Sequence, residues 1–359
     1  MQELESWLIL NHAPGIGPIR AQKILEIFDK PENIICCQSK ERKQTGLFPK
    51  PALDYFAAQN FTLIDKDLAL LKELNTNIIH LGHADYPQLL SEIPDPPLVL
   101  YLRGSKNILS MPQVSIVGSR NPDAVGRRLS YTFARDLAQN GVTITSGMAS
   151  GIDTCAHQGG LQGNAGTIAV MGTGLDRIYP GKNRELAHKI AANGLLLSEF
   201  APGTGPKAEN FPRRNRVISG LSLGTLVVQA ALKSGSLITA RLASEQGREV
   251  FAVPGAIKNP LTRGTHALIK QGAKLVETTN DILEELPGML QLVQSMASEV
   301  TTKDKDSSLL QYIEFEPMLI DDLVSKSQLA VDKVSAELLE LELVGKVQML
   351  SGTRVQRIA

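Results

Sequence analysis

Short apolar runs alternate with segments of helical spacing through the middle of the chain. Each run holds four or five mostly apolar residues, and the segments between them place apolar residues on one face, as Leu129, Phe133 and Leu137 do within Arg127–Asn140. Strands that are apolar on both faces are typical of parallel sheets covered by helices on both sides. The pattern predicts an α/β domain over 110–286 with a Rossmann-like, doubly wound, mostly parallel sheet. Its expected strands are Val114–Val117, Thr143–Ser146, Thr167–Met171, Leu195–Ser198, Thr225–Gln229 and Glu249–Val253.

The segment before this sheet predicts an N-terminal helical domain over 1–109. The turn Pro14–Pro18 precedes a helix whose apolar positions run from Ile19 to Phe28. This spacing is typical of a helix-hairpin-helix or SAM-like unit, in which glycines let backbone N–H groups approach a phosphate. Such turns also simply join two packed helices, so both interpretations stay open at this point.

The end of the chain predicts a linker over 287–308 and a winged-helix domain over 309–359. The expected elements are helices at Leu309–Ile313, Ile320–Lys326 and Val331–Leu341, then strands at Val347–Leu350 and Arg354–Ile358. Winged helices often bind duplex DNA. Because this one is acidic, we expect it to contact protein instead.

Charge is balanced overall but unevenly distributed. The 359 residues carry 37 basic and 37 acidic side chains. The segment Ala201–Leu275 contains eleven lysines and arginines and three acidic residues, whereas Glu277–Glu342 contains four lysines and fifteen acidic residues. This asymmetry indicates a basic working surface in the middle of the chain and an acidic terminal module. No apolar run approaches ~18 residues and no basic leader opens the chain, so we expect no membrane segment and no secretion. The three cysteines fit a protein of the reducing cytoplasm.

Glycine-bearing turns follow four of the expected strands. They are Gly118–Arg120, Ser146–Asp153, Gly172–Asp176 and Ser234–Leu237. In an open α/β sheet the ligand lies beyond the carboxyl ends of the strands, where such turns converge. Glycines permit close backbone approach there, and helix N-termini favour anions. One glycine alone is better explained by packing, but four turns on one edge predict a phosphate-binding site.

The common nucleotide fingerprints are missing. After Gly172 and Gly174, Arg177 stands where G-x-G-x-x-G needs its third glycine, and Lys182 is followed by Asn183 rather than by serine or threonine. Histidines and cysteines also lack the spacing of a metal site or a catalytic nucleophile. We therefore expect no cofactor, no metal and no catalytic residue.

The densest cationic feature is F-P-R-R-N-R at Phe211–Arg216. Guanidinium groups bind phosphates in bidentate fashion and stack on bases, and a phenylalanine adds a stacking face for a single strand. Lys182 and Lys207 lie in neighbouring turns. A solvated arginine loop is the alternative interpretation.

Eight motifs in order resemble the DprA (Smf) family of DNA-processing proteins. They are S-I-V-G-S-R (Ser115–Arg120), S-G-M-A-S-G-I-D (Ser146–Asp153), G-T-G-L-D-R-I-Y-P-G-K-N (Gly172–Asn183), S-E-F-A-P-G (Ser198–Gly203), F-P-R-R-N-R-V-I-S-G-L-S (Phe211–Ser222), S-G-S-L-I-T-A (Ser234–Ala240), G-R-E-V-F-A-V-P-G (Gly247–Gly255) and L-I-K-Q-G-A (Leu268–Ala273). The resemblance implies a bacterial homodimer that binds and protects incoming single-stranded DNA in natural transformation. It also implies that the protein helps to load the recombinase RecA onto that strand and catalyses no reaction.

The resemblance also implies which residues hold the strand. In the family these are the arginine of the G-S-R turn and nearby lysines, which correspond to Arg120, Lys182 and Lys207. Gln229 stands where many members carry a glutamate, and it keeps hydrogen-bonding capacity without the charge. We expect Arg120 and the N–H groups of Gly118 and Ser119 to hold one phosphate. The full expected DNA-binding set is Gly118, Ser119, Arg120, Ser146, Gly147, Lys182, Asn183, Lys207, Phe211, Arg213, Arg214, Asn215, Arg216, Ser234 and Gly235.

Two other classes of function compete with this one. Rossmann-like enzymes that cleave nucleoside monophosphates share the glycine turns, and Glu199 is the candidate acid here. The sequence lacks their compact P-G-G-x-G-T turn. An adaptor that acts only through its winged helix would need no Arg120 at all.

Overall fold

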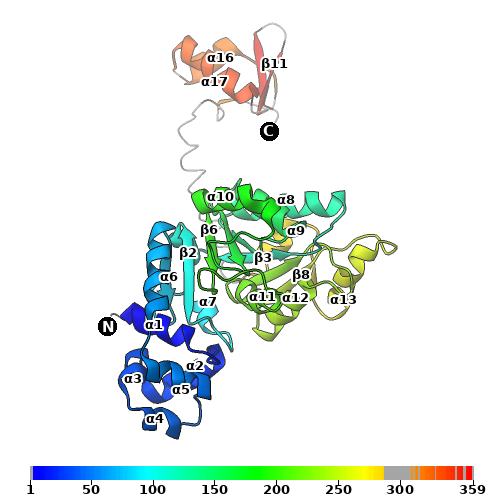
Figure 1. The fold of residues 1–359 in the computed structure, drawn as a ribbon. Helices are drawn as coiled ribbons and strands as arrows, with labels where there is room; N and C mark the ends of the chain where they lie inside the picture. The colour runs from blue at the N-terminus through cyan, green and yellow to red at the C-terminus, as the bar shows by residue number, and fades with distance from the viewer. Residues whose placement is uncertain are drawn as a thin grey trace. The chain divides into compact units, whose positions relative to one another are not determined.

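The computed structural model describes residues 3–286, 309, 312–313, 316–327, 329–343, 346–350 and 353–357 (Figure 1). The chain forms two compact units, Met1–Pro287 and Gly288–Ala359. The expected linker, 287–308, lies outside the described residues.

One large sheet forms the centre of the first unit. Its strands are β1 (Asn77–His80), β2 (Val99–Gly104), β3 (Gln113–Val117), β4 (Thr143–Ser146), β5 (Thr167–Met171), β6 (Leu195–Ser198), β7 (Gly224–Val227), β8 (Glu249–Ala252) and β9 (Lys274–Leu275). Their order across the sheet is β1-β2-β6-β5-β4-β3-β7-β8-β9. All pairs from β6 to β9 are parallel, and β2 pairs with β1 and β6 antiparallel. The expected strands are confirmed as β3 to β8, with ends within two residues.

Helices cover both faces of this sheet (Figure 1). One layer holds α8 (Ala124–Gln139), α9 (Ile152–Gly160) and α10 (Arg184–Asn193), and the other α11 (Asn210–Gly220), α12 (Ser236–Glu245) and α13 (Arg263–Lys270). Short elements connect or follow them: α7 (Gln88–Ser91), η1 (Lys106–Ser110), η2 (Gly181–Asn183), η3 (Pro260–Thr262) and α14 (Thr279–Leu283). The doubly wound α/β fold is therefore confirmed.

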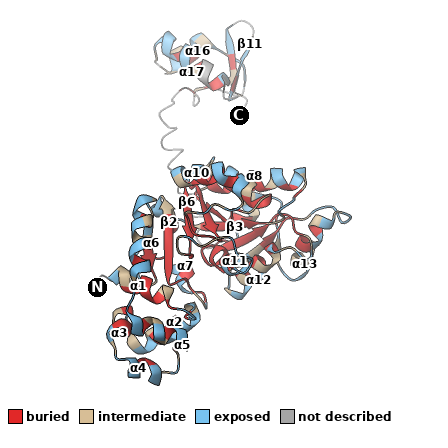
Figure 2. Ribbon diagram, in the orientation of Figure 1, coloured by how far each residue is buried: buried red, intermediate tan, exposed pale blue. Residues whose placement is uncertain are grey.

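Successive residues of a central strand enter different cores. In β5, Ala169 and Met171 pack in a cluster with Ile190 of α10, whereas Ile168 and Val170 pack in a cluster with residues of α11. Side chains alternate across a strand, so a strand between two helical layers must be apolar throughout. The strands are accordingly buried over most of their length (Figure 2).

The helical part of the N-terminal region is shorter than expected. It holds α1 (Glu3–His12), α2 (Pro18–Phe28), α3 (Pro31–Cys36), α4 (Ser39–Gln44), α5 (Lys50–Ala58) and α6 (Thr62–Glu73). The expected helical domain does not extend to residue 109, because β1 and β2 belong to the large sheet. Leu102 of β2 pairs with Leu197 of β6 in this sheet. Two short strands without a crossover helix give no βα periodicity, which is why the sequence pattern misses them.

The second unit has a winged-helix arrangement. Its described elements are β10 (Met318–Leu319), α16 (Ile320–Ser327), α17 (Val331–Leu343), β11 (Val347–Leu350) and β12 (Arg354–Arg357). Leu323, Val334, Leu338 and Val355 share its core. The second and third expected helices and the hairpin strands are confirmed. The first expected helix, 309–313, falls partly outside the described residues.

Candidate nucleic-acid interface

The sheet has its topological switch point between β3 and β7. These two strands are neighbours, but the chain leaves β3 through α8 toward β4 and leaves β7 through α12 toward β8. The loops after them therefore diverge and leave a crevice at the carboxyl edge. A cavity of about 840 Å³ opens there, which we call the edge cavity. From the expected set it is lined by Gly118, Ser119, Arg120, Phe211, Arg214, Asn215, Ser234 and Gly235.

A cationic and aromatic cluster forms one wall of the edge cavity. Arg120 is exposed, and its guanidinium carbon lies 6.0 Å from the ring centroid of Phe211. The ring of Tyr179 lies 5.5 Å from that of Phe211. Phe211 itself sits against Gly172, where a Cβ atom would lie 2.9 Å from the phenylalanine ring. The glycine of this turn therefore makes room for Phe211 rather than for a phosphate.

Arg214 lines the edge cavity but is not part of a solvated loop. It lies in α11 and is only 5% exposed. Its Nη1 donates to the carbonyls of Gly147 and Val170, and its Nε donates to Asn215 Oδ1 at 3.2 Å. Burial lowers the pKa of Arg214 to about 10, and the charge of Asp153 opposes this shift. Arg214 thus ties α11 to the ends of β4 and β5 and adds positive charge to the cavity floor.

The turn after β4 is filled by a group of the protein itself. The Asp153 carboxylate accepts hydrogen bonds from the N–H groups of Gly147 and Ala149, both at 3.2 Å. Ser146 is fully buried and donates to the carbonyl of Ile116 at 2.6 Å. The expectation that Ser146 and Gly147 offer free contacts to DNA is therefore wrong, because the Ser146 hydroxyl and the Gly147 N–H already form hydrogen bonds within the protein. Burial raises the pKa of Asp153, and Arg214 opposes that rise.

The turn after β3 is also partly occupied. The N–H of Ser119 donates to the Gln229 carbonyl at 2.7 Å. The expectation that this N–H holds a phosphate is therefore wrong. At Gly118 a Cβ atom would lie 2.7 Å from Ile152, which explains this glycine by packing. The Gln229 side chain accepts from the N–H of Asp123 at 3.3 Å and also bonds the Asp123 side chain, at the start of α8. From this turn, the Arg120 side chain remains available to a ligand.

Three further members of the expected set lie outside the edge cavity because they serve the fold. Asn183 is 4% exposed, and its Nδ2 donates to the Met148 carbonyl at 2.8 Å. Arg216 is buried and forms ion pairs with Glu199 and, at 3.1 Å, with Asp95. Arg213 is half-exposed and pairs with the same Glu199 at 3.2 Å.

Glu199 is consequently the centre of an ion-pair network. Its side chain is 3% exposed. Burial raises its pKa, and the guanidinium groups of Arg216 and Arg213 oppose that rise. Residues three apart on a helix share a face, so Arg213 and Arg216 of α11 reach one carboxylate while Arg214 points elsewhere. The network fastens α11, which carries Phe211 and Arg214, to the rest of the unit.

The N-terminus of α12 forms another wall of the edge cavity. Ser234, Gly235 and Ser236 line it, and the first turn of α12 holds no acidic residue. Gly235 has φ −62°, and a Cβ atom there would meet nothing within 4 Å. Packing therefore does not explain this glycine. The N–H groups of Ser236, Leu237 and Ile238 bond within this turn, to Ser234 Oγ and to the carbonyls of Ser234 and Gly235. The helix dipole and the open space beside Gly235 are therefore what favour an anion here.

Two lysines of the expected set, Lys182 and Lys207, do not line the edge cavity but lie in segments next to it. Lys207 is exposed between Pro206 and Ala208, both of which line the cavity, and Lys182 is exposed in η2. Lys233 lines the cavity directly and was not expected from the sequence. A single lysine in a turn forms no sequence pattern, so nothing in the sequence singled it out.

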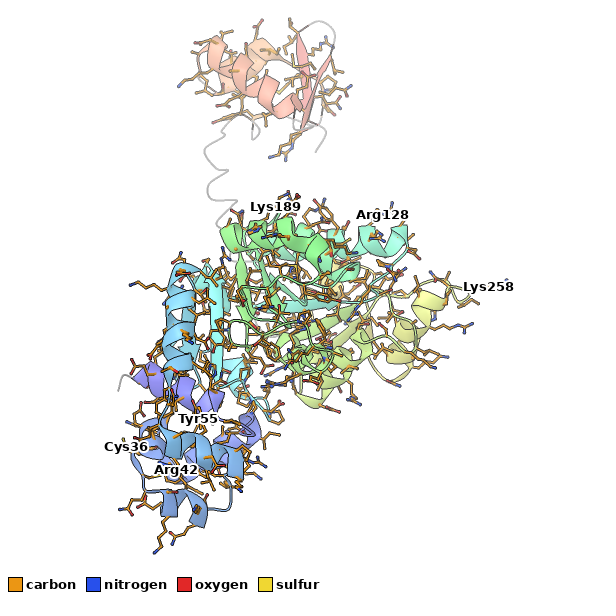
Figure 3. The ribbon with its side chains drawn as sticks, in the orientation of Figure 1. Cys36, Arg42, Tyr55, Arg128, Lys189 and Lys258 are labelled. Carbon is orange, nitrogen blue, oxygen red and sulfur yellow. The ribbon has the colours of Figure 1, made fainter. Side chains whose placement is uncertain are left out.

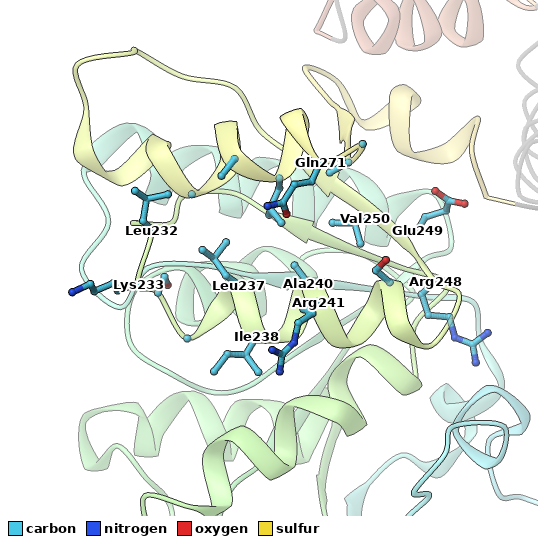
Figure 4. Close-up of a pocket in the computed structure, with 18 residues that line it drawn as sticks. Leu232, Lys233, Leu237, Ile238, Ala240, Arg241, Arg248, Glu249, Val250 and Gln271 are labelled. Atoms are coloured by element: carbon cyan, nitrogen blue, oxygen red, sulfur yellow. The ribbon is translucent and has the colours of Figure 1, made fainter.

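A second cavity, of about 740 Å³, lies between α12, β8 and α13 (Figure 4). Its arginines are engaged with carboxylates: Arg241 lies 3.5 Å from Glu245, and Arg248 lies 3.6 Å from Glu92. Lys233 borders both cavities. The edge cavity therefore offers the less compensated positive charge.

The part of the chain that the structure describes shows neither a metal-ligand cluster nor a membrane-spanning helix. Within it, no group of three or more histidine, cysteine or acidic side chains is placed to hold a metal ion. None of its helices combines the length and the apolar character needed to cross a membrane.

Comparison with known proteins identifies the class. Residues 77–287 match the family model "DNA recombination-mediator protein A", and residues 294–353 match "DprA winged helix domain". Protein Smf of Escherichia coli is 41% identical over 322 residues, covering 88% of this chain and 86% of that protein. DNA processing protein DprA of Bacillus subtilis is 44% identical over 230 residues, covering 64% and 77%.

Two solved structures agree with this assignment. DprA of Streptococcus pneumoniae superposes with a TM-score of 0.71 and 36% identity, covering 80% of this chain and 99% of that one. DNA processing protein A of Helicobacter pylori, described for its single-stranded DNA binding mode, has a TM-score of 0.55 and 32% identity, covering 62% and 97%. The fold is thus that of a DNA recombination mediator. The chain belongs to the DprA (Smf) family.

Proposed function

We propose that the protein binds single-stranded DNA in the edge cavity. The observation that carries this proposal is the exposed guanidinium of Arg120 over the ring of Phe211, in the same cavity as the open N-terminus of α12 at Gly235. The arginine and the helix N-terminus attract phosphates, and the aromatic ring offers a face for a base. The Helicobacter pylori relative is described for its single-stranded DNA binding mode, which supports the choice of ligand.

The aromatic wall favours single strands over duplexes. A base must be unpaired and unstacked before its face can reach Phe211 or Tyr179, and in a duplex those faces are covered by neighbouring bases. Phosphate contacts alone do not make this distinction, because both forms carry them.

The biological role that we propose follows the family. The protein acts as a homodimer in the cytoplasm, protects incoming single strands during natural transformation and helps to load RecA onto them. Family membership and the ligand chemistry of the edge cavity support this role. The test of RecA loading is the rate at which RecA forms filaments on a single strand with and without the protein. The dimer is tested by sedimentation.

We also propose that the protein is not an enzyme. Glu199, the candidate acid for cleavage of nucleoside monophosphates, is held by Arg213 and Arg216 and does not line the edge cavity. If incubation with nucleoside monophosphates releases free base, and Glu199→Gln abolishes that release, the enzyme interpretation replaces ours.

The central experiment is fluorescence anisotropy with a labelled poly(dT) strand and a duplex of equal length across a salt series. With four or five phosphate contacts, log K should fall with log salt with a slope of about −3 for the single strand. Equal, weak binding to both forms would refute the proposal.

A further inference from the structure

A smaller hollow lies on the other side of the turn that floors the edge cavity. Its volume is about 340 Å³, and it lies between α8, α9 and α10. We call it the α8–α10 hollow. Its polar lining residues include Tyr131, Thr154, Gln158, Lys182, Glu185 and Lys189.

The two sites are neighbours along the chain. Asp153 lines the edge cavity and the next residue, Thr154, lines the α8–α10 hollow. Tyr179 lines the edge cavity and Lys182, one short turn later, lines the hollow. Asn183 joins the two turns, because its Nδ2 donates to Thr154 Oγ1 at 3.0 Å. A strand that leaves the edge cavity past Tyr179 therefore meets Lys182 and the hollow next.

The surface around the hollow is rich in unpaired cations. Five exposed side chains come from α8, η2 and α10, and none of them forms an ion pair with the described residues: Arg127, Arg128, Lys182, Arg184 and Lys189. By contrast, Arg135 of α8 pairs with Asp136 at 2.8 Å. Glu185 is the acidic side chain that lines the hollow, so positive charge dominates there.

Contacts place these cations on one side of the sheet. Figure 3 shows Arg128 on α8 and Lys189 on α10 along the same side of the unit. Arg127 lies one helical turn before Tyr131, which lines the hollow. Burial raises the pKa of the Cys155 thiol and the Arg127 charge opposes that rise, which puts Arg127 beside α9.

We propose that the α8–α10 hollow is a second subsite for the same single strand. The strand leaves the edge cavity past Lys182, and its phosphates lie near Lys189 and Arg128. The Tyr131 ring offers a stacking face for one base. This inference rests on the proposed function and extends it, because it gives the path of the strand beyond the edge cavity and lengthens the bound segment.

The test compares two strand lengths on full-length variants. A dT strand of about 5 nucleotides fills one site and a strand of about 20 spans both. Arg128→Gln/Lys189→Gln should bind the long strand about tenfold more weakly, with a salt slope smaller by about 1.4, because two phosphate contacts of ~0.7 each are lost. Its affinity for the short strand should change less than about twofold. Both side chains are exposed, so the melting temperature should not change.

The matched control is Lys43→Gln/Lys66→Gln. It removes the same charge from exposed positions of α4 and α6 and should leave both slopes unchanged. If the hollow variant behaves like this control on the long strand, the second subsite is refuted. If the wild-type protein binds neither strand, the proposed function fails and the subsite with it. If Arg120→Ala weakens both lengths while the hollow variant matches the control, only the subsite is wrong.

Discussion

The Asp153 carboxylate accepts a hydrogen bond from the N–H of Gly147 at 3.2 Å, and so takes the place that an anionic ligand would need. The carbonyl of the same glycine accepts from the Arg214 guanidinium. An acid and a base of the protein therefore hold both polar groups of this residue. Phosphate affinity must come from other groups in the edge cavity, namely Arg120, the surrounding lysines and the N-terminus of α12.

This difference between glycines gives a first prediction. Gly147→Ala should destabilise the protein by about 1–3 kcal/mol, because the new Cβ would lie 2.6 Å from Arg214 Nη1. Gly235→Ala should leave stability within ~0.5 kcal/mol and weaken DNA binding, because its methyl group meets no protein atom and occupies the ligand's approach. Urea unfolding and anisotropy on both variants check this. Equal loss of stability in the two would contradict it.

Arg120→Ala should remove one phosphate contact. The salt slope for a single strand should become less steep by about 0.7, and affinity should fall at low salt, since the Arg120 guanidinium forms no ion pair with a described acidic side chain and its charge is available to a phosphate. Arg120→Lys keeps the charge but loses the planar group over Phe211, so the slope should persist while affinity falls. An Arg120→Ala protein with unchanged slope and affinity would exclude Arg120 from the site.

His157 makes stability depend on pH. Its Nε2 accepts from the N–H of Met148 at 3.3 Å, and its Nδ1 lies 2.8 Å from the Thr167 hydroxyl, so the buried ring is neutral. Burial lowers the pKa of His157 from 6.5 to about 3. The stabilisation that the neutral His157 ring gives to the folded state is therefore complete above the unfolded-state pKa of 6.5, and it is lost as the pH falls toward 3.

The expected loss is about 1.4 kcal/mol per pH unit inside that window. Urea unfolding at a pH near neutral and again about two units below 6.5 should show it. The His157→Gln variant is the control, because its amide does not titrate. If wild type and variant lose the same stability between these two pH values, His157 is not the titrating group.

The Glu199 network should show strong coupling. Glu199→Gln alone leaves Arg216 buried without its full counter-charge and should cost about 3 kcal/mol. Glu199→Leu with Arg216→Met should cost less than the sum of the two single changes, because the pair is removed together. The measurement is urea unfolding of the wild type, Glu199→Leu, Arg216→Met and the double variant. Additive costs in free energy of unfolding would contradict the coupling. Since neither residue lines the edge cavity, folded variants should keep their salt slope for DNA.

Much of the fold follows from the sequence because burial dictates its pattern. Every residue of β3 to β7 is buried, as is the carboxyl half of β8, and the glycine turns after four of these strands mark the carboxyl edge. The strands β1 and β2 did not follow, because they join the sheet antiparallel without a crossover helix. Their pairing with β6 is a long-range relationship that local periodicity does not encode.

The candidate site was harder to predict than the fold. Composition made Arg213, Arg214 and Arg216 look equivalent, yet Arg214 is hydrogen-bonded to two strand ends while the other two share Glu199. Helical spacing separates them, but only if the segment is recognised as the helix α11. Arg120 was predicted from the resemblance to the family and from its place in a glycine turn after an expected strand. Lys233 was missed because a single lysine in a turn carries no pattern.

The antiparallel strands β1 and β2 also decide where the protein can be cut. A fragment that begins at residue 110 would retain every strand-end loop of the edge cavity. It would lose β2, the antiparallel neighbour of β6. The backbone groups of Leu195–Ser198 would then form an open, apolar sheet edge, which invites pairing between chains. Such a fragment should aggregate. A fragment that begins just before Asn77 keeps β1 and β2 but loses α1, whose Leu8 and Leu10 share a core with Val99 and Tyr101. It should therefore aggregate as well, and the whole first unit should remain monodisperse.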